Sequence, residues 1–146
     1  MHSFKEQRIM PYNFELIKDI IMDIEKYPDF LPWCDHATIL SKTDQYITAE
    51  LTVSFKSFSE NYISKVLLEK NNDEYIIQAE AISGPFEYLQ NIWNIKRHNN
   101  ASIVNFSIDF QFKSKILNKL IGIVFSKATE KMIAAFEERA KNLSQV

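Results

Sequence analysis

Residues 104–143, VNFSIDFQFKSKILNKLIGIVFSKATEKMIAAFEERAKNL, change from a strand pattern to a helix pattern at one point in the chain. Up to Phe112, apolar and polar residues alternate with a period of two, which predicts a strand with one dry face and one wet face. Over 115–143 the apolar residues recur every three or four positions, which predicts a long amphipathic helix. Ser114 stands at the expected N-cap, and Gly122 marks a kink or a break between two helices. The predicted apolar stripe consists of Leu117, Leu120, Ile121, Val124, Ala128, Met132, Phe136, Ala140 and Leu143.

Further strand patterns precede this segment. Residues 47–55 alternate almost perfectly, and two more runs cover 57–69 and 74–82, separated by the turn Asn71-Asn72-Asp73. Ser83-Gly84-Pro85 breaks the chain before the run FEYLQNIWNI, and another polar turn follows at 98–100. Successive strands joined by short turns, with no helix between them, predict an antiparallel meander.

The N-terminal third predicts a strand, a helix and an irregular segment. A short strand over 3–10 ends at Pro11, and a helix begins at Phe14 with Asn13 as its N-cap. The helix is expected to stop before Pro28, since the residue preceding a proline is disfavoured in the α region. Residues 27–34, YPDFLPWC, contain two prolines and are expected to form an irregular turn with four large apolar side chains.

The order strand, helix, strands and long helix predicts an α+β fold in a single domain over 1–146. We expect a curved antiparallel sheet that holds the C-terminal helix in its concavity. Aromatic residues make up 13% of the chain, a composition that fits both a sheet enclosing a cavity and a well-filled core.

Charge and cysteine content exclude several function classes. The chain has 17 basic and 19 acidic residues among 146, and a net charge of −2 argues against a general nucleic-acid binder, so we expect no DNA partner. One cysteine excludes a disulfide framework and a cysteine-based zinc site. The N-terminus resembles neither a signal peptide nor a transit peptide, and no apolar run reaches the length of a membrane span, so a cytoplasmic location is expected.

No motif in the sequence indicates catalysis or a metal site. The three histidines are dispersed and none has the spacing of a helical metal site. Cys34 lies two residues from His36, so it is interpreted either as a thiolate nucleophile or as a small apolar residue behind Trp33. Glu60 and Glu80 lie in predicted strands, where a solvated face is the simpler interpretation than a pocket. We therefore predict no catalytic residue and no metal ligand.

Two features remain open on the residues alone. The loop Phe30-Leu31-Pro32-Trp33 forms either a lip over a cavity or a plug packed into the core. The beginning of the last helix carries lysines interleaved with apolar residues and only one acidic residue, Glu130. Such a face either contacts an anionic surface or is simply solvated. The lysines are Lys113, Lys115, Lys119, Lys127 and Lys131.

Three blocks of the chain resemble one known family. Residues 23–34, DIEKYPDFLPWC, are similar to the signature DVExYPxFLPWC of the coenzyme Q-binding START-domain family, within the polyketide cyclase/dehydrase-like group. Gly84-Pro85-Phe86 with Leu89 and Trp93 resembles a second block, GPFxxLxxxW. A third block consists of FQFKS at 110–114 followed by Met132, Ala135-Phe136 and Arg139-Ala140. Lys18 departs from the bulky apolar residue that the family tends to have there.

The resemblance implies a helix-grip (START/Bet v 1-like) fold with a deep apolar cavity. It implies non-enzymatic binding of ubiquinone or a related isoprenoid quinone lipid, in support of respiratory electron transfer, with no cofactor besides that ligand. The family also includes bacterial ribosome-association toxins, which implies the alternative of binding the large ribosomal subunit and blocking subunit association. An enzyme, a cyclase or hydrolase acting on an apolar substrate, is the third alternative; it would need paired polar groups in the cavity, and the sequence shows none.

The sequence predicts two sets of binding residues. The mouth of the cavity is assigned to Phe30, Leu31 and Trp33; its sheet side to Phe55, Ile77, Ala79, Ala81, Leu89, Trp93, Phe106 and Phe110; and its helix side to Leu120, Val124 and Met132. Contact with an anionic membrane or with the ribosome is assigned to Lys113, Lys115, Ile116, Lys119 and Lys127. A peripheral position on the inner membrane is the alternative to a purely cytoplasmic location.

Overall fold

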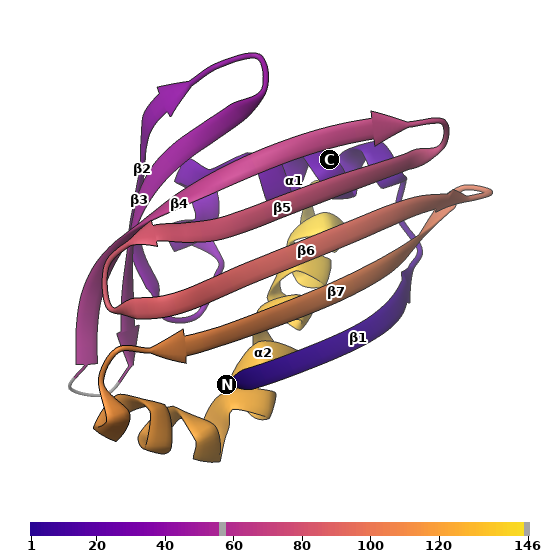
Figure 1. The fold of residues 1–146 in the computed structure, drawn as a ribbon. Helices are drawn as coiled ribbons and strands as arrows, with labels where there is room; N and C mark the ends of the chain where they lie inside the picture. Colours follow the sequence, from indigo (N-terminus) through magenta and orange to yellow (C-terminus); the bar gives the residue numbers. More distant parts are fainter. Residues whose placement is uncertain (56–57, 145–146) are drawn as a thin grey trace.

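The computed structural model describes residues 1–55 and 58–144 (Figure 1). In chain order the elements are β1 (His2–Met10), α1 (Phe14–Met22), the 3-10 helix η1 (Ile24–Asp29), β2 (Cys34–Lys42), β3 (Tyr46–Phe55), β4 (Phe58–Asn71), β5 (Glu74–Ser83), β6 (Phe86–His98), β7 (Ala101–Phe112) and α2 (Lys115–Ser144).

The strands form one antiparallel sheet in the order β1-β7-β6-β5-β4-β3-β2. Apart from β1, each strand pairs with its neighbour in sequence, so the predicted meander is confirmed. Figure 1 shows the sheet bending around α2, with α1 and α2 on the same face of the sheet. The α+β fold with one long C-terminal helix in the concavity of the sheet is therefore as expected.

The predicted helix boundaries are largely confirmed. The Asn13 side chain accepts a hydrogen bond from the backbone N–H of Glu15 at 2.7 Å, and the Ser114 hydroxyl accepts one from Leu117 at 3.2 Å. The last helix continues through Gly122, so α2 is one element rather than two. Residue 57, the expected first residue of one strand run, lies outside the described residues.

Two local features differ from expectation. α1 ends at Met22, and the first three residues of the expected irregular turn belong to the 3-10 helix η1, which contains Pro28. Strand β2 was not predicted, because most of its residues are exposed and its apolar positions are few. Its pairing with β3 is also shifted twice in register, as is common at a sheet edge.

The apolar face of α2 differs from the predicted stripe. The buried residues of the helix are Phe125, Thr129, Ile133, Phe136 and Ala140. Leu120 is 59% exposed and points away from the sheet, so its assignment to the cavity wall is wrong. Apolar residues in the first turns of α2 cover more than half of the helix circumference, a wider face than the one that packs on the sheet, so periodicity alone could not select that face.

Candidate functional site

Part of the expected cavity wall is packed core. Ile77, Trp93, Phe106 and Phe110 are at most 5% exposed. The Trp93 ring lies 4.9 Å from that of Phe136 on α2 and 4.7 Å from that of Phe106. Large rings from both layers therefore meet directly here, and the assignment of these four residues to a ligand surface stays a prediction.

The remainder of the predicted wall keeps accessible surface. Ala79 and Ala81 follow the buried Ile77 on the inward face of β5, and Ala81 is paired with the buried Ser64 of β4. Both alanines are half-buried although they lie in the middle of the sheet. Small side chains at these positions leave room beneath them. Half-buried side chains of the same predicted set are Leu31, Phe55, Leu89, Val124 and Met132.

The buried residues form two clusters rather than one. The larger cluster joins α1, most strands and the C-terminal half of α2, whereas the smaller consists of Phe110, Phe112 and Phe125. Met132 and Ala79 pack against the first cluster, and Leu89 packs against the second. The accessible inner surface thus adjoins both clusters, and we define it as the candidate ligand-binding interior.

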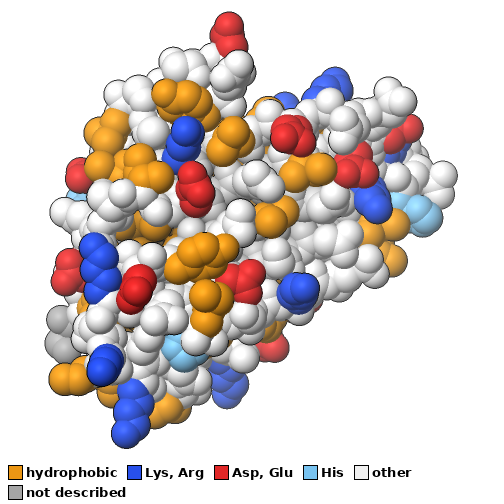
Figure 2. Space-filling model, in the orientation of Figure 1, with side chains coloured by type: hydrophobic (Ala, Val, Ile, Leu, Met, Phe, Trp, Pro, Cys, Tyr) orange, Lys and Arg blue, Asp and Glu red, His pale blue; other side chains and the backbone are white. Residues whose placement is uncertain are grey.

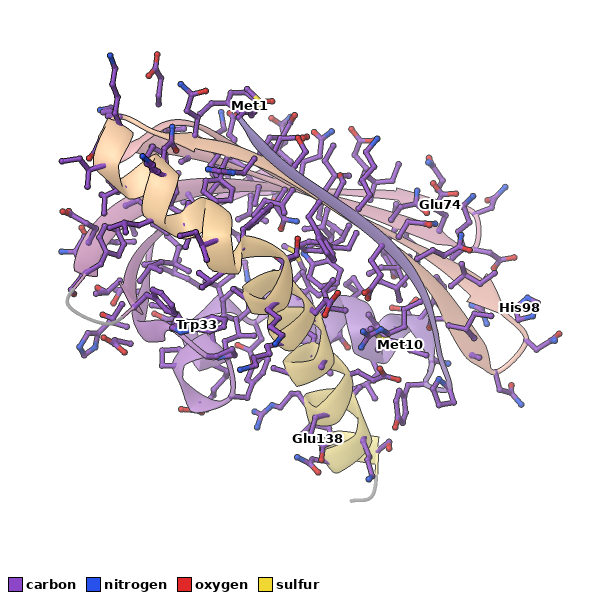
Figure 3. The ribbon with its side chains drawn as sticks, turned by 90° about the horizontal axis from the view of Figure 1, so that it is seen from below. Met1, Met10, Trp33, Glu74, His98 and Glu138 are labelled. Atoms are coloured by element: carbon purple, nitrogen blue, oxygen red, sulfur yellow. The ribbon has the colours of Figure 1, made fainter. Side chains whose placement is uncertain are left out.

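The aromatic loop divides between the two roles left open by its sequence. Phe30 packs into the core, with its ring 5.4 Å from that of Phe136, and the Arg139 guanidinium lies 5.2 Å from its centroid. Trp33 instead lies edge-on to Phe55 at 5.8 Å. In Figure 3, α2 runs between β1 and the segment that carries Trp33. Phe30 therefore acts as a plug, whereas Trp33 stays half-buried beside the interior.

The backbone fixes the position of Trp33. Its φ of 64° lies in the left-handed region, which is costly for a bulky residue. The backbone N–H of Ser54 donates to the Trp33 carbonyl at 2.9 Å and ties the loop to β3. This indole is therefore held in place by the neighbouring strand.

Three titratable side chains meet in this otherwise apolar region, namely Tyr27, Cys34 and Tyr62. Burial raises the pKa of Tyr27, and the neighbouring Tyr62 and Cys34 raise it further. Burial likewise raises the pKa of Tyr62, followed by the effect of Cys34. Both phenols therefore remain protonated at neutral pH. Sequence reasoning missed Tyr62, whose only signal was a tyrosine at an inward position of its strand.

Cys34 is a neutral thiol in this setting. Burial, and secondarily the nearby Asp35, raises its pKa to about 11. Its Sγ–H donates to the backbone oxygen of His36 at 3.7 Å rather than to the imidazole, and His36 is exposed. The structure favours the apolar interpretation of Cys34 over the thiolate nucleophile. Glu60 and Glu80 are exposed, which agrees with a solvated face.

The structure explains why the sequence block Gly84-Pro85-Phe86 begins with a glycine. Its φ is +113°, and a Cβ atom there would lie 2.5 Å from Tyr62 Cβ and 2.9 Å from the Asn61 carbonyl oxygen. The ring of Phe86 packs edge-on to that of Tyr62 at 5.1 Å. Gly84 and Phe86 thus hold the Tyr62 side chain from two directions.

The first half of α2 presents an exposed apolar and basic face. Ile116, Leu120 and Ile123 are 74%, 59% and 82% exposed, and their spacing of four and three residues places them on one side of the helix. Figure 2 shows basic and apolar side chains next to one another at the lower end of the molecule, where α2 begins. The lysines of this face, all exposed, are Lys113, Lys115, Lys119, Lys127 and Lys131. We call this surface the basic helix face.

Other features of the described residues add no second site. Within 1–55 and 58–144, no group of three or more His, Cys, Asp or Glu side chains could hold a metal ion. In the same part of the chain, no helix is long and apolar enough to cross a membrane. A hollow of about 390 Å³ on the outer side of the sheet and one of about 930 Å³ beside the β4–β5 turn are open surface depressions.

The bent antiparallel sheet and its long terminal helix define a helix-grip protein of the START and Bet v 1-like class. A START-superfamily protein from Mycobacterium smegmatis has a solved structure that matches with a TM-score of 0.82 over 98% of this chain and 99% of its own, at 19% identity. Residues 10–137 match the family described as polyketide cyclase / dehydrase and lipid transport, and the chain belongs to that family.

Two curated relatives refine the comparison. The chain is 45% identical to the ribosome association toxin RatA of Rickettsia prowazekii, over 98% of this chain and 99% of that protein. It is 26% identical to the mitochondrial coenzyme Q-binding protein COQ10 homolog B of Xenopus laevis, over 94% of this chain and 57% of that protein. The resemblance found in the sequence is thereby confirmed, and the ribosome-associated relative is the more similar of the two.

Proposed function

We propose that this protein associates with the large ribosomal subunit through the basic helix face and thereby opposes subunit joining. The observation that carries the proposal is the 45% identity, along nearly the full length of both chains, to a protein named as a ribosome association toxin. This alternative is favoured over a role confined to quinone binding, because the relative named for coenzyme Q binding is less similar.

The charge distribution supports this mode of binding. Ribosomal RNA is polyanionic, and a protein with a net charge of −2 needs a local excess of basic groups to bind it. The basic helix face supplies five exposed lysines, with Glu130 as the acidic residue among them. Ile116 and Ile123 add apolar area that a partner surface could cover.

Charge reversal tests the proposal. The double variant K115E/K119E is expected to bind large subunits about tenfold or more weakly than the original protein in low-salt co-sedimentation. In a plot of the logarithm of the binding constant against the logarithm of the salt concentration, the slope should become less steep by about 0.7–0.9 for each lysine–phosphate contact removed. The matched control is K42E/K96E, which makes the same change in net charge at exposed lysines of β2 and β6. Equal losses in both variants would show that only overall charge matters and would overturn the assignment of this face.

A second function, binding of an isoprenoid quinone in the interior in support of respiratory electron transfer, is favoured by a separate observation. Inward-facing alanines of β5 and neighbouring apolar side chains are only half-buried on the inner face of the sheet, where a full core would bury them. Each CH₂ group buried there contributes about 0.8 kcal/mol, so a polyisoprenoid tail binds with few polar contacts. The interior and the basic helix face are different surfaces, so both functions can coexist.

Lipid uptake tests this second function. The protein is incubated with phosphatidylcholine vesicles that contain decylubiquinone, re-isolated, and extracted for mass spectrometry. We expect about one quinone per protein chain at saturation. A protein of unrelated fold, treated in the same way, gives the background level of quinone. If the re-isolated protein carries no more quinone than this background, interior binding is contradicted and the ribosome proposal still stands.

A further inference from the structure

The inner face of the sheet carries a tyrosine whose hydrogen bonding is incomplete, Tyr62. Tyr62 lies on β4 opposite the buried Leu51, and the inward positions that follow it, Ser64 and Val66, are buried. The tyrosine therefore points toward α2 rather than toward solvent outside the sheet. It packs against the larger core cluster, and its ring also contacts Phe86, which belongs to the smaller one.

The Tyr62 hydroxyl lacks a hydrogen-bond partner within the described residues, whereas the hydroxyl of Tyr27 donates to the Ile21 carbonyl. The fully enclosed polar side-chain atoms that lack a hydrogen bond in this part of the chain are Glu6 Oε2 and Asn94 Oδ1. The Tyr62 hydroxyl is not among these atoms, so it is not fully enclosed by the protein.

The side chain is also rigidly placed. The close approach of the Gly84 backbone to the Tyr62 Cβ and the edge-on Phe86 ring restrict its movement. A donor that is already fixed loses little conformational entropy when a ligand binds to it. Rigid placement is what a positioned anchoring group requires.

We propose that Tyr62 is the hydrogen-bond donor that anchors the uncharged, oxygen-bearing head group of the ligand in the interior. The inference rests on the second proposed function and names the chemistry of the ligand's polar end. The acceptor is a carbonyl or ether oxygen on an otherwise apolar molecule. Its hydrogen bond satisfies the free hydroxyl, which is otherwise left without a partner in an apolar region.

The surroundings select against a charged head group. Tyr62 stays protonated, because burial and Cys34 both raise its pKa, and no basic side chain is among the groups that act on it. Cys34 is itself neutral and offers only a weak donor. A carboxylate or phosphate placed here would lose its water without gaining a counter-ion. A fatty acid is therefore expected to bind less well than a quinone with a tail of the same length.

The test compares two ligands that share a decyl tail. Protein is equilibrated with phosphatidylcholine vesicles that contain equal amounts of decylubiquinone and decylbenzene, and the bound amounts are measured by mass spectrometry. Replacing Tyr62 by phenylalanine (Y62F) removes only the hydroxyl. We expect the ratio of bound quinone to bound hydrocarbon to fall about three- to tenfold, with the hydrocarbon load unchanged. Y88F is the matched control, because Tyr88 is exposed and its hydroxyl donates to Gln90 at 2.9 Å.

The outcomes separate this inference from the function on which it rests. An unchanged ratio in Y62F, or equal losses of both ligands, would overturn the role of Tyr62 while interior binding persists. Failure of the original protein to take up either ligand would overturn interior binding, and the anchoring role with it. The thermal unfolding midpoint of Y62F is measured as a control for folding. If it lies within a few degrees of that of the original protein, a fall in the ratio of bound quinone to bound hydrocarbon reflects loss of the hydroxyl and not a change in the fold.

Discussion

Replacing Gly84 by alanine should lower the free energy of unfolding by about 3 kcal/mol and the thermal midpoint by about 10 °C. Two effects add. The φ of +113° is one that residues with a Cβ atom rarely adopt. The new methyl group would also meet the Tyr62 Cβ at 2.5 Å and the Asn61 carbonyl oxygen at 2.9 Å. Neither neighbour is the end of a flexible side chain, so the strands must separate.

The other glycine of the chain provides the control. Gly122 lies within α2, and a Cβ there would first meet the ring of His2 at 3.0 Å, a side chain rather than the backbone of a neighbouring strand. Alanine favours a helix over glycine by about 1 kcal/mol, so Gly122→Ala should be neutral or stabilising. Chemical denaturation of both variants, followed by circular dichroism, measures the difference. Equal stability of the two alanine variants would show that the contact between Gly84 and Tyr62 relaxes freely.

The sequence predicted correctly those parts of the fold in which a single local pattern, such as period-two alternation or a capping side chain, determines the structure. Along β7 the period-two alternation matches the buried and exposed faces, and the side chain of Asn13 caps α1 as its chemistry suggested. The N-terminal half of α2 was harder. Its apolar residues cover more than half of the helix circumference, so Leu120 was assigned to the interior although only packing decides that Phe125 faces the sheet.

The candidate site was partly hidden from sequence for a related reason. Whether an inward aromatic residue fills space or borders it depends on its partner across the layers. Trp93 and Phe110 meet Phe136 and Phe125 and become core, whereas Ala79 stays half-buried. The role of Tyr62 depends on a close approach by Gly84, a residue more than twenty positions away in sequence. Neither of these contacts between distant residues produces a pattern that can be recognised in a short stretch of sequence.

The two proposed functions use opposite sides of one helix. The lysines lie on the outer side of α2, while Met132 and the buried Phe125 lie on its inner side. Variants on one side should therefore leave the other activity intact: K115E/K119E should still take up quinone, and Y62F should still bind large subunits. This independence allows each function to be tested without the other.

Alkylation of Cys34 by iodoacetamide at pH 8 should be about 100-fold slower in the folded protein than in the unfolded chain. Only the thiolate reacts, and burial raises the thiol pKa from 9.0 to about 11, so the thiolate fraction at pH 8 falls by about two orders of magnitude. Because the chain has a single cysteine, mass spectrometry of the intact protein reports this site alone.

The pH profile separates a raised pKa from simple shielding of Cys34. With a pKa near 11, the rate in the folded protein should rise about tenfold per pH unit up to about pH 10, while the rate in denaturant levels off above pH 9. Shielding alone would slow the reaction without moving the pH at which it levels off. A folded protein that reacts at pH 8 as fast as the unfolded chain would restore the thiolate nucleophile and with it an enzymatic role. A slow, pH-shifted reaction leaves Cys34 as a neutral part of the wall beside Tyr62.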